Sequence, residues 1–175
     1  PQPIGIQTVR CQGVRHYLDN VAHKAHLHLE EPDVVAVFGL VDLYGLPLDL
    51  PARANRDVKI DFARQHILRL LAPGDRPRFH QHFAVHETEA WLLSDPRLFA
   101  PRIRLPDRCS HPEEVDFQEP PAKLLDRLWL HAYQRGYKKI VQGKTLFPQL
   151  DPALVYSKCP HFRRMLDEML QVATA

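Results

Sequence analysis

The sequence predicts an α/β fold in which a small parallel sheet is flanked by helices and followed by an all-helical extension. Strand-like and helix-like apolar patterns alternate over residues 4–93, as in a parallel sheet with helical crossovers. The last third of the chain carries helical patterns alone. With 175 residues, of which 45% are hydrophobic and 25% charged, the chain is long enough for one domain with a packed core.

Each element of the α/β part is predicted from its own pattern. Alternating apolar and polar residues predict a strand, apolar residues at helical spacing predict a helix, and a short β-branched run between turn residues predicts a buried strand. In chain order, these patterns predict a strand over Ile4–Val9, a helix over Gly13–Leu29, a buried strand over Val34–Leu40, a loop from Val41 into the mid-fifties, a helix over Val58–Leu71, a strand over Arg78–Val85 and a short helix over Glu87–Leu93.

The rest of the chain is predicted to be helical after an extended, proline-rich connection between Pro96 and Pro121. Helices are predicted over Pro121–Tyr133, which begins with a first-turn proline, over Tyr137–Gln142, from Pro152 after an Asp151 cap, and over Pro160–Val172. We therefore predict an α/β core over residues 1–118 and a basic helical extension over residues 119–175 that packs on the core.

Composition disfavours several classes of protein. No apolar stretch approaches the ~20 residues of a membrane span, and no secretory leader pattern opens the sequence. Cys11, Cys109 and Cys159 lack the spacing of a zinc site or a disulfide scaffold, so we expect a cytoplasmic protein. Only seven glycines occur and no two stand close enough to form a phosphate-binding loop, which argues against P-loop or dinucleotide-binding proteins.

The net charge of +2 is small, but the charges are unevenly distributed. The basic side chains between residues 123 and 164 are Lys123, Arg127, Arg135, Lys138, Lys139, Lys144, Lys158, Arg163 and Arg164, and the only acids there are Asp126 and Asp151. The stretch from Glu30 to Asp61 is acidic instead. A basic lobe with an acidic strand edge suits a phosphodiester and its metal ion. Solvated helix faces also collect lysine and arginine, so that alternative stays open.

Asp42 is the first carboxylate after the predicted strand Val34–Leu40. Ligands of open α/β sheets bind at the carboxyl ends of the strands, where an acid can hold a divalent metal ion or take a proton. The alternative is a turn aspartate bonded to its own backbone, before the Gly45-Leu46-Pro47 turn. Position alone does not decide between these two interpretations.

A second group of candidate residues, His86-Glu87-x-Glu89, follows the predicted strand Arg78–Val85. If the two strands are parallel neighbours, this group and Asp42 converge at one edge of the sheet. Oxygen ligands with one imidazole suit Mg²⁺ or Mn²⁺ better than Zn²⁺. The alternative is that the acids are favoured by the dipole of a helix's first turn and that His86 caps or packs.

Four basic residues are predicted to screen phosphate charge, namely Lys123, Lys138, Lys139 and His161. A catalytic cysteine needs a base held nearby, and the sequence places none beside Cys159. We therefore expect Cys159 to pack in the core. For His161 we expect a contact with phosphate or with the backbone.

Several of these residues belong to segments with a family resemblance. The segments are Val41–Pro47, His86–Pro96, Pro121–Lys123 and Cys159–Phe162, in order over nearly the whole chain. They resemble a bacterial TOPRIM-like family catalogued as a domain of unknown function (number 4276). The resemblance implies a TOPRIM-like, Rossmann-like α/β fold and kinship with overcoming-lysogenisation-type nucleases. It also implies a setting in mobile elements or antiviral defence, often beside an ATPase.

The chain departs from that family in two places. Such proteins open with a strand and a Val-Glu-Gly-x-Thr-Glu-like turn, whose glutamate acts in metal-dependent TOPRIM chemistry, and this sequence begins at Pro1 without that element. The Asp-x-Asp pair of TOPRIM enzymes is here Asp42-Leu43-Tyr44, so a phenol replaces one metal-binding acid. Either the acidic strand comes from outside this sequence, or the protein has lost catalysis.

We predict a metal-dependent nuclease or phosphodiesterase of the TOPRIM type that acts on nucleic acid. Asp42, Glu87 and Glu89 would bind Mg²⁺ or Mn²⁺, with Glu89 as a ligand or base. His86 would orient the scissile phosphate or relay a proton. The alternative is a non-catalytic subunit that binds an ATPase, an effector protein or nucleic acid. A small-molecule phosphotransfer enzyme is a third option.

Overall fold

The computed structural model describes residues 4–43, 45–51, 53–113 and 119–175. It is a mixed α/β structure with a two-stranded parallel sheet, which pairs β1 (Val37–Asp42) with β2 (Phe79–Ala84). The chain forms two compact units. The first unit contains Pro1–Phe83 and Asp167–Ala175, and the second contains Ala84–Leu166. These units do not coincide with the predicted boundary after residue 118, which stays a prediction.

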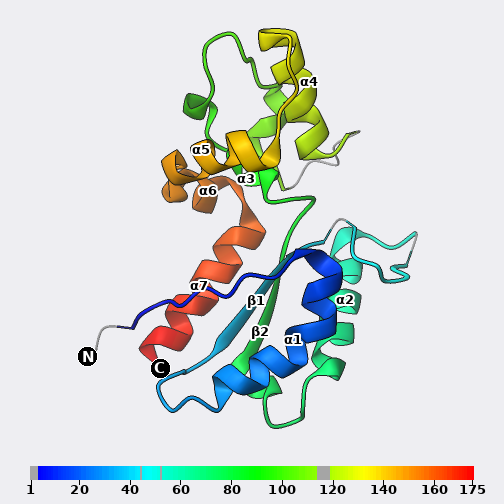
Figure 1. The fold of residues 1–175 in the computed structure, drawn as a ribbon, viewed down its shortest axis with the longest axis vertical. Coiled ribbons are helices and arrows are strands. Elements are labelled where there is room, and N and C mark those ends of the chain that lie inside the picture. Colours follow the sequence, from blue (N-terminus) through cyan, green and yellow to red (C-terminus); the bar gives the residue numbers. More distant parts are fainter. Residues whose placement is uncertain (1–3, 44, 52, 114–118) are drawn as a thin grey trace. The chain divides into compact units, whose positions relative to one another are not determined.

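Seven helices are found in the described ranges (Figure 1). They are α1 (Gly13–Leu29), α2 (Arg56–Leu70), α3 (Glu89–Leu92), α4 (Pro121–Tyr133), α5 (Lys144–Leu146), α6 (Pro152–Lys158) and α7 (Pro160–Thr174). Short 3-10 turns lie at Arg76–Arg78, Pro96–Leu98, Asp107–Ser110 and Phe147–Gln149, and a π-helical turn lies at Lys139–Gly143. The predicted helices over Gly13–Leu29 and Pro121–Tyr133 are confirmed with their bounds.

The predicted strand over Ile4–Val9 is wrong. These residues have no regular secondary structure and are exposed, with Ile6 keeping 78% of its surface in solvent. The apolar alternation was present, but a strand also needs a neighbouring edge to accept its hydrogen bonds. The two-stranded sheet of the described residues does not extend to this segment.

The predicted strand over Val34–Leu40 is displaced, because β1 begins at Val37 and ends with Asp42. Arg78 explains the later start. Its guanidinium donates to the carbonyls of Val34 and Val35, and also to the carbonyl of Leu29 at the end of α1. The backbone before Val37 therefore bonds to an arginine side chain instead of a strand partner.

The helices predicted over Val58–Leu71 and Pro160–Val172 are α2 and α7, with ends shifted by one or two residues. Two further predicted helices differ more. The helix expected over Glu87–Leu93 is the four-residue α3, Glu89–Leu92. The helix expected over Tyr137–Gln142 is the π-helical turn Lys139–Gly143, which continues into α5. The predicted cap at Asp151 is confirmed, since its carboxylate accepts from the backbone N–H of Ala153 at 2.9 Å.

The sheet of the first unit has a helix contact on each face, and one of them involves Gln81 of β2. Successive side chains of a strand point to opposite faces, so Gln81 and His82 face opposite ways. Tyr17 of α1 donates its hydroxyl proton to the side-chain oxygen of Gln81. Gly39 of β1 lies directly under this pair, where a Cβ would collide with both side chains. The glycine thus lets α1 approach the sheet closely.

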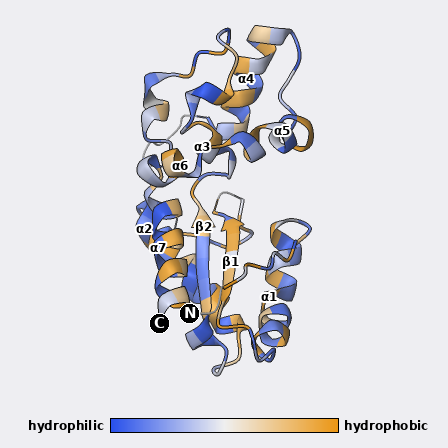
Figure 2. Ribbon diagram, turned by 90° about the vertical axis from the view of Figure 1, so that its left-hand side faces the viewer, coloured by the Kyte–Doolittle hydropathy of each residue, from blue (hydrophilic) through white to orange (hydrophobic). Residues whose placement is uncertain are grey.

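The opposite face of β2 carries His80 and His82. Glu168, in the part of α7 that belongs to the first unit, contacts both rings, at 2.6 Å from His80 Nδ1 and 2.9 Å from His82 Nε2. Phe38 of β1 stacks on both imidazoles, with centroids 4.7 and 5.9 Å away. Figure 2 shows the consequence: β1 is hydrophobic and β2 is largely hydrophilic, although most of β2 is buried.

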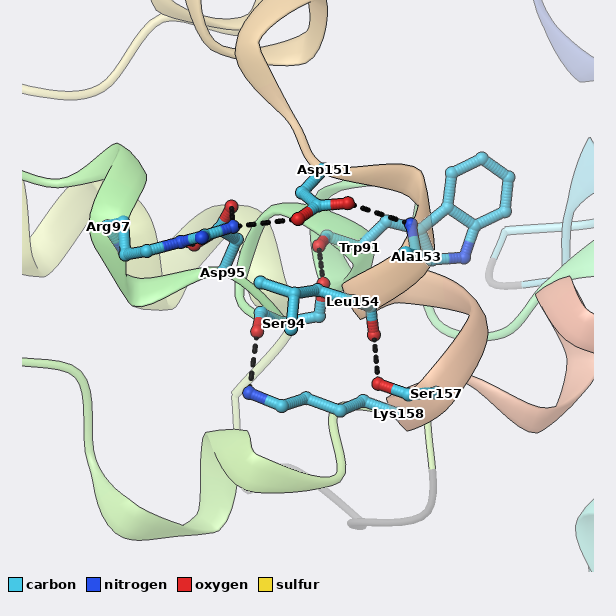
Figure 3. A network of polar contacts seen from close by, with 9 residues as sticks. All are labelled: Trp91, Ser94, Asp95, Arg97, Asp151, Ala153, Leu154, Ser157 and Lys158. Atoms are coloured by element: carbon cyan, nitrogen blue, oxygen red, sulfur yellow. Dashed lines mark hydrogen bonds and ion pairs between the residues drawn. The ribbon is translucent and has the colours of Figure 1, made fainter.

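The second unit is built from helices and turns around two apolar clusters. The buried residues of the larger are Leu92, Leu93, Phe99, Ile103, Cys109, Leu124, Leu125, Trp129, Tyr137 and Leu146, and those of the smaller are Ala84, Trp91, Val155 and Cys159. A polar network joins its turns (Figure 3): Arg97 donates to the carboxylate of Asp95 at 2.8 and 3.0 Å and to Asp151 at 3.0 Å. Lys158 of α6 donates to the carbonyl of Ser94 at 2.8 Å. Hydrogen bonds and ion pairs of this kind hold turns and short helices that are not stable alone.

Candidate functional site

Two predicted carboxylates, Glu87 and Glu89, meet at one cation in the second unit. The ammonium nitrogen of Lys139 lies 2.9 Å from Glu87 Oε1 and 3.0 Å from Glu89 Oε2. Glu89 is 3% exposed, and the cation that compensates its charge is the half-exposed Lys139. We call Glu87, Glu89, Lys139 and Tyr137, introduced below, the Glu–Lys–Tyr cluster.

The turn that presents these carboxylates is strained at His86. His86 has a φ of 66°, in the left-handed region that non-glycine residues rarely adopt. The N–H of Glu87 donates to the carbonyl of Val85 at 3.0 Å, so the hydrogen bond spans one residue, as in a γ-turn. Such a residue costs on the order of 1–3 kcal/mol, and residues of this kind concentrate at active sites and ligand clamps. The strain supports a functional interpretation of this turn.

Glu87 is also held by the beginning of α4. Its second carboxylate oxygen accepts from the backbone N–H of Ala122 at 2.9 Å. The first N–H groups of a helix lack partners within the helix and carry its positive end. Glu87 is therefore fixed by an ammonium on one oxygen and by a helix N–H on the other.

Tyr137 is a member of the cluster that the sequence analysis missed. Tyr137 is buried, with 8% of its surface exposed. Its hydroxyl has no hydrogen-bond partner within the part of the chain that the structure describes. Burial raises the pKa of this phenol above its ordinary value, and the negative charges of Glu89 and Glu87 raise it further. Its place directly before Lys138-Lys139 was the only signal in the sequence.

Lys139 was predicted to contact phosphate, and the structure places its ammonium on the two glutamates. Burial works against the charged form of Lys139, yet the hydrogen bonds to Glu87 and Glu89 raise its pKa above the ordinary lysine value. The side chain therefore stays protonated. An ammonium carries three protons, and the two glutamates occupy two of them.

The other predicted phosphate contacts lie apart from these bonds. Lys123 is exposed on α4, and Lys138 is exposed just before the π-helical turn. The backbone N–H of His161 donates to the buried carboxylate of Glu113 at 2.7 Å, and the expected contact of His161 with phosphate or with the backbone stays a prediction. Cys159 is fully buried beside Val155 and Trp91, as expected for a packing residue.

Asp42 is half-buried as the last residue of β1. The condition set for its convergence with Glu87 is that the two strands be parallel neighbours, and they are. Asp42 belongs to the first unit and Glu87 to the second, so their meeting at one metal ion stays a prediction. Tyr44, the predicted replacement of a metal-binding acid, lies outside the described residues.

Within the described ranges, no three His, Cys, Asp or Glu side chains are arranged to hold a metal ion together. Glu87 and Glu89 supply two carboxylates directed at one positive charge, as Asp95 and Asp151 do at Arg97. We also find, over the same ranges, no helix with the length and apolar character needed to cross a bilayer.

Comparison with protein families gives one match. Residues 3–170 match the family described as "Domain of unknown function (DUF4276)". No significant match was found among curated proteins or among solved structures. Because the matched residues cover nearly the whole sequence, including all members of the Glu–Lys–Tyr cluster, the chain belongs to the DUF4276 family.

Proposed function

We propose that this protein is a metal-dependent phosphodiesterase that acts on nucleic acid, with Glu87 and Glu89 holding a divalent cation. The observation that supports the proposal is the convergence of both carboxylates on the single charge of Lys139, at 2.9 and 3.0 Å. A relation to TOPRIM nucleases, and a setting in prokaryotic defence or mobile elements, belong to the same proposal.

The residues fit the ion in their chemistry. Mg²⁺ and Mn²⁺ prefer carboxylate oxygens, and Mg²⁺ keeps several water ligands, so two protein carboxylates can suffice to hold it. The buried charge of Glu89 requires a cation nearby in any case, because an uncompensated carboxylate is costly away from water. A bound divalent ion would polarise the phosphoryl oxygens and lower the pKa of a water molecule.

The residues of the chain would then divide the remaining work. Lys139, exchanged from the carboxylates, neutralises charge on the phosphate. His86 orients the scissile phosphate or relays a proton from its strained position. The predicted role of Asp42 as a further ligand is part of the proposal and is tested separately.

The first test is cation binding. Calorimetric titration with MnCl₂ is expected to show binding to the wild-type chain, and Glu87→Gln and Glu89→Gln to weaken it by about tenfold or more, since each removes a charged ligand. Lys139→Met removes the competing ammonium and is expected to strengthen binding by about tenfold. Lys123→Met is the matched control, because it removes a charge elsewhere in the second unit.

The second test is cleavage of labelled DNA and RNA with Mn²⁺ or with EDTA. We expect cleavage only with the metal ion, and its loss in Glu89→Gln and in Asp42→Ala. Absence of both Mn²⁺ binding and cleavage in the wild-type chain would refute the proposal. Intact cleavage by Asp42→Ala would remove Asp42 from it while leaving the two glutamates.

The second candidate is a non-catalytic subunit that binds a protein or nucleic-acid partner. It is favoured by the bonds that Glu87 and Glu89 already make within the chain, to Lys139 and to the N–H of Ala122. In that case Lys139→Met leaves Mn²⁺ binding absent and only lowers the melting temperature. Copurification with an ATPase or effector protein would then identify the partner.

A further inference from the structure

Two arginines share one tyrosine ring in the second unit. The guanidinium carbons of Arg102 and Arg135 lie 5.2 and 5.8 Å from the centroid of Tyr133, the last residue of α4. Both distances are within the range of cation–π attraction. The two guanidinium groups are therefore at most about 11 Å apart, on one side chain that holds them both. We call these three residues the Arg–Tyr–Arg site.

The local fold fixes the tyrosine and one of the arginines. The Tyr133 ring is half-buried and packs at 5.9 Å from Trp129, whose side chain belongs to the larger apolar cluster of this unit. Gln134 has a φ of 56° and donates its N–H to the carbonyl of Leu130, which ends α4 and reverses the chain. The turn brings Arg135 back over the ring of Tyr133. The turn thus sets the position of the Arg135 backbone, from which the side chain reaches the ring.

The two guanidinium groups keep their hydrogen-bonding capacity. Both arginines are exposed, and over the described ranges neither has a carboxylate partner. Arg97, by contrast, is paired with Asp95 and Asp151, and Arg127 with Glu119. The sequence between Arg127 and Leu150 contains no acid at all. The carboxylate of Asp126 lies against Gly136, the residue after Arg135, so two guanidinium charges face one nearby acid and an anionic partner still meets a net positive charge.

We propose that the Arg–Tyr–Arg site binds single-stranded nucleic acid, which rests on the proposed function and identifies a surface that holds its substrate. Guanidinium planes and aromatic rings stack on nucleobases, and guanidinium N–H groups donate to phosphate in pairs. A single strand exposes both its base faces and its phosphates. A duplex hides the base faces, and an acidic peptide has none. The two guanidinium planes held on the ring, with their paired N–H donors, therefore fit a single strand best.

The test measures binding of a fluorescent single-stranded oligonucleotide by anisotropy, in EDTA, so that no metal-dependent step contributes. The double variant Arg102→Ala/Arg135→Ala is expected to bind about tenfold more weakly. The dependence of affinity on salt should also become less steep, because phosphate contacts are lost. Tyr133→Leu is expected to lose a similar amount and Tyr133→Phe to keep the affinity, since the ring rather than the hydroxyl is required.

The matched control is Arg163→Ala. Arg163 is a single arginine 5.9 Å from the ring of Tyr156 in the same unit, so its removal costs one charge, half of the two that the double variant loses, and one contact of the same kind. It should change affinity less than about twofold. Equal effects of the control and of either Arg–Tyr–Arg variant would overturn the proposal, as would equal competition by polyglutamate and by unlabelled oligonucleotide. Thermal melting of each variant checks that it folds.

The outcomes separate this inference from the proposed function. Oligonucleotide binding that depends on the Arg–Tyr–Arg site, without Mn²⁺-dependent cleavage, would refute the phosphodiesterase alone. Cleavage with an unchanged KM in the Arg102→Ala/Arg135→Ala variant would refute the Arg–Tyr–Arg site alone.

Discussion

The two units of this protein bury different kinds of polar group. In the first unit, the buried polar side chains among the described residues are Gln81 and His82, which are neutral or easily made so. In the second unit they include three carboxylates, Glu89, Asp95 and Glu113. A buried carboxylate is tolerated only with matched donors or cations, so the second unit depends on specific polar contacts to a degree that the first does not.

The helices differ in the same direction. The first unit has α1 and α2, of 17 and 15 residues, packed with a sheet. The second has one helix of comparable length, α4, of 13 residues, and the beginning of α7 up to Leu166. Its other helices, α3, α5 and α6, have four, three and seven residues and are joined by turns. Short helices are not stable alone, and their side-chain contacts must hold them in place. We therefore expect the loss of a single polar group to be more costly in the second unit than in the first.

The largest effect is expected at Glu113. Its fully buried carboxylate accepts from the indole N–H of Trp91 at 2.9 Å and from the N–H of His161 at 2.7 Å. Glu113→Ala strands both donors and is expected to lower the free energy of unfolding by about 3 kcal/mol. Both tryptophans of the chain, Trp91 and Trp129, lie in the second unit, so urea unfolding followed by tryptophan fluorescence reports on it.

Glu113→Gln is the control, because it keeps one acceptor and should cost about half as much. A loss below about 1 kcal/mol in Glu113→Ala would break the comparison between the units.

The next effect is expected at Asp95. This carboxylate is 2% exposed and accepts from the side chain and the backbone N–H of Arg97, so Asp95→Ala should cost about 2 kcal/mol. The hydrogen bond from the Arg97 side chain is the largest cause that lowers the Asp95 pKa. The stabilisation that the ionised Asp95 contributes is therefore fully present above the ordinary pKa of about 4. It is lost as the pH falls from there through the lowered pKa of the folded protein. Urea unfolding at several pH values should show that the free energies of unfolding of the wild type and of Asp95→Ala become more similar as the pH falls into the acid range.

Helix caps offer a direct comparison, because each unit has one. Asn55 caps α2 by accepting from the N–H of Val58 at 3.0 Å, and Asp151 caps α6 by accepting from Ala153 at 2.9 Å. Asn55→Ala is expected to cost about 1 kcal/mol. Asp151→Ala should cost more, since it also breaks the ion pair with Arg97. Thermal melting of both variants decides which cap contributes more. A larger fall of the melting temperature in Asn55→Ala than in Asp151→Ala would contradict the expected difference between the units.

The smallest effect at neutral pH is expected at His82. Burial is the main cause that lowers its pKa; Glu168 opposes this, while Arg64 and His80 add to it. A histidine with a lowered pKa stabilises the fold above its ordinary value of about 6.5, and this contribution is lost as the pH falls through the lowered pKa. Far-ultraviolet circular dichroism should show stability falling below about pH 6.5 in the wild type and falling less in His82→Gln. Identical pH profiles of the wild type and of His82→Gln would contradict this expectation.

Parts of both units could be predicted from the sequence. Helix α1 was predicted with its bounds because Tyr17, Val21, Ala25 and Leu29 form a regular stripe, and all four are buried. Glu87 and Glu89 were singled out because they follow a strand. The failures have one common cause, which is a partner distant in the sequence. Arg78 decides where β1 begins from 44 residues away, and Lys139 reaches Glu87 across 52 residues.

The sequence alone determined the periodic elements, since the spacing of apolar residues along a helix or strand is a local property that any tertiary arrangement must satisfy. Only the tertiary structure decided which charges meet. It directed the ammonium of Lys139 to two carboxylates, buried the hydroxyl of Tyr137, and placed Arg102 and Arg135 on one ring. The physical reason is that ion pairs and ring contacts act over a few ångströms, whereas their members are separated by tens of residues in the chain.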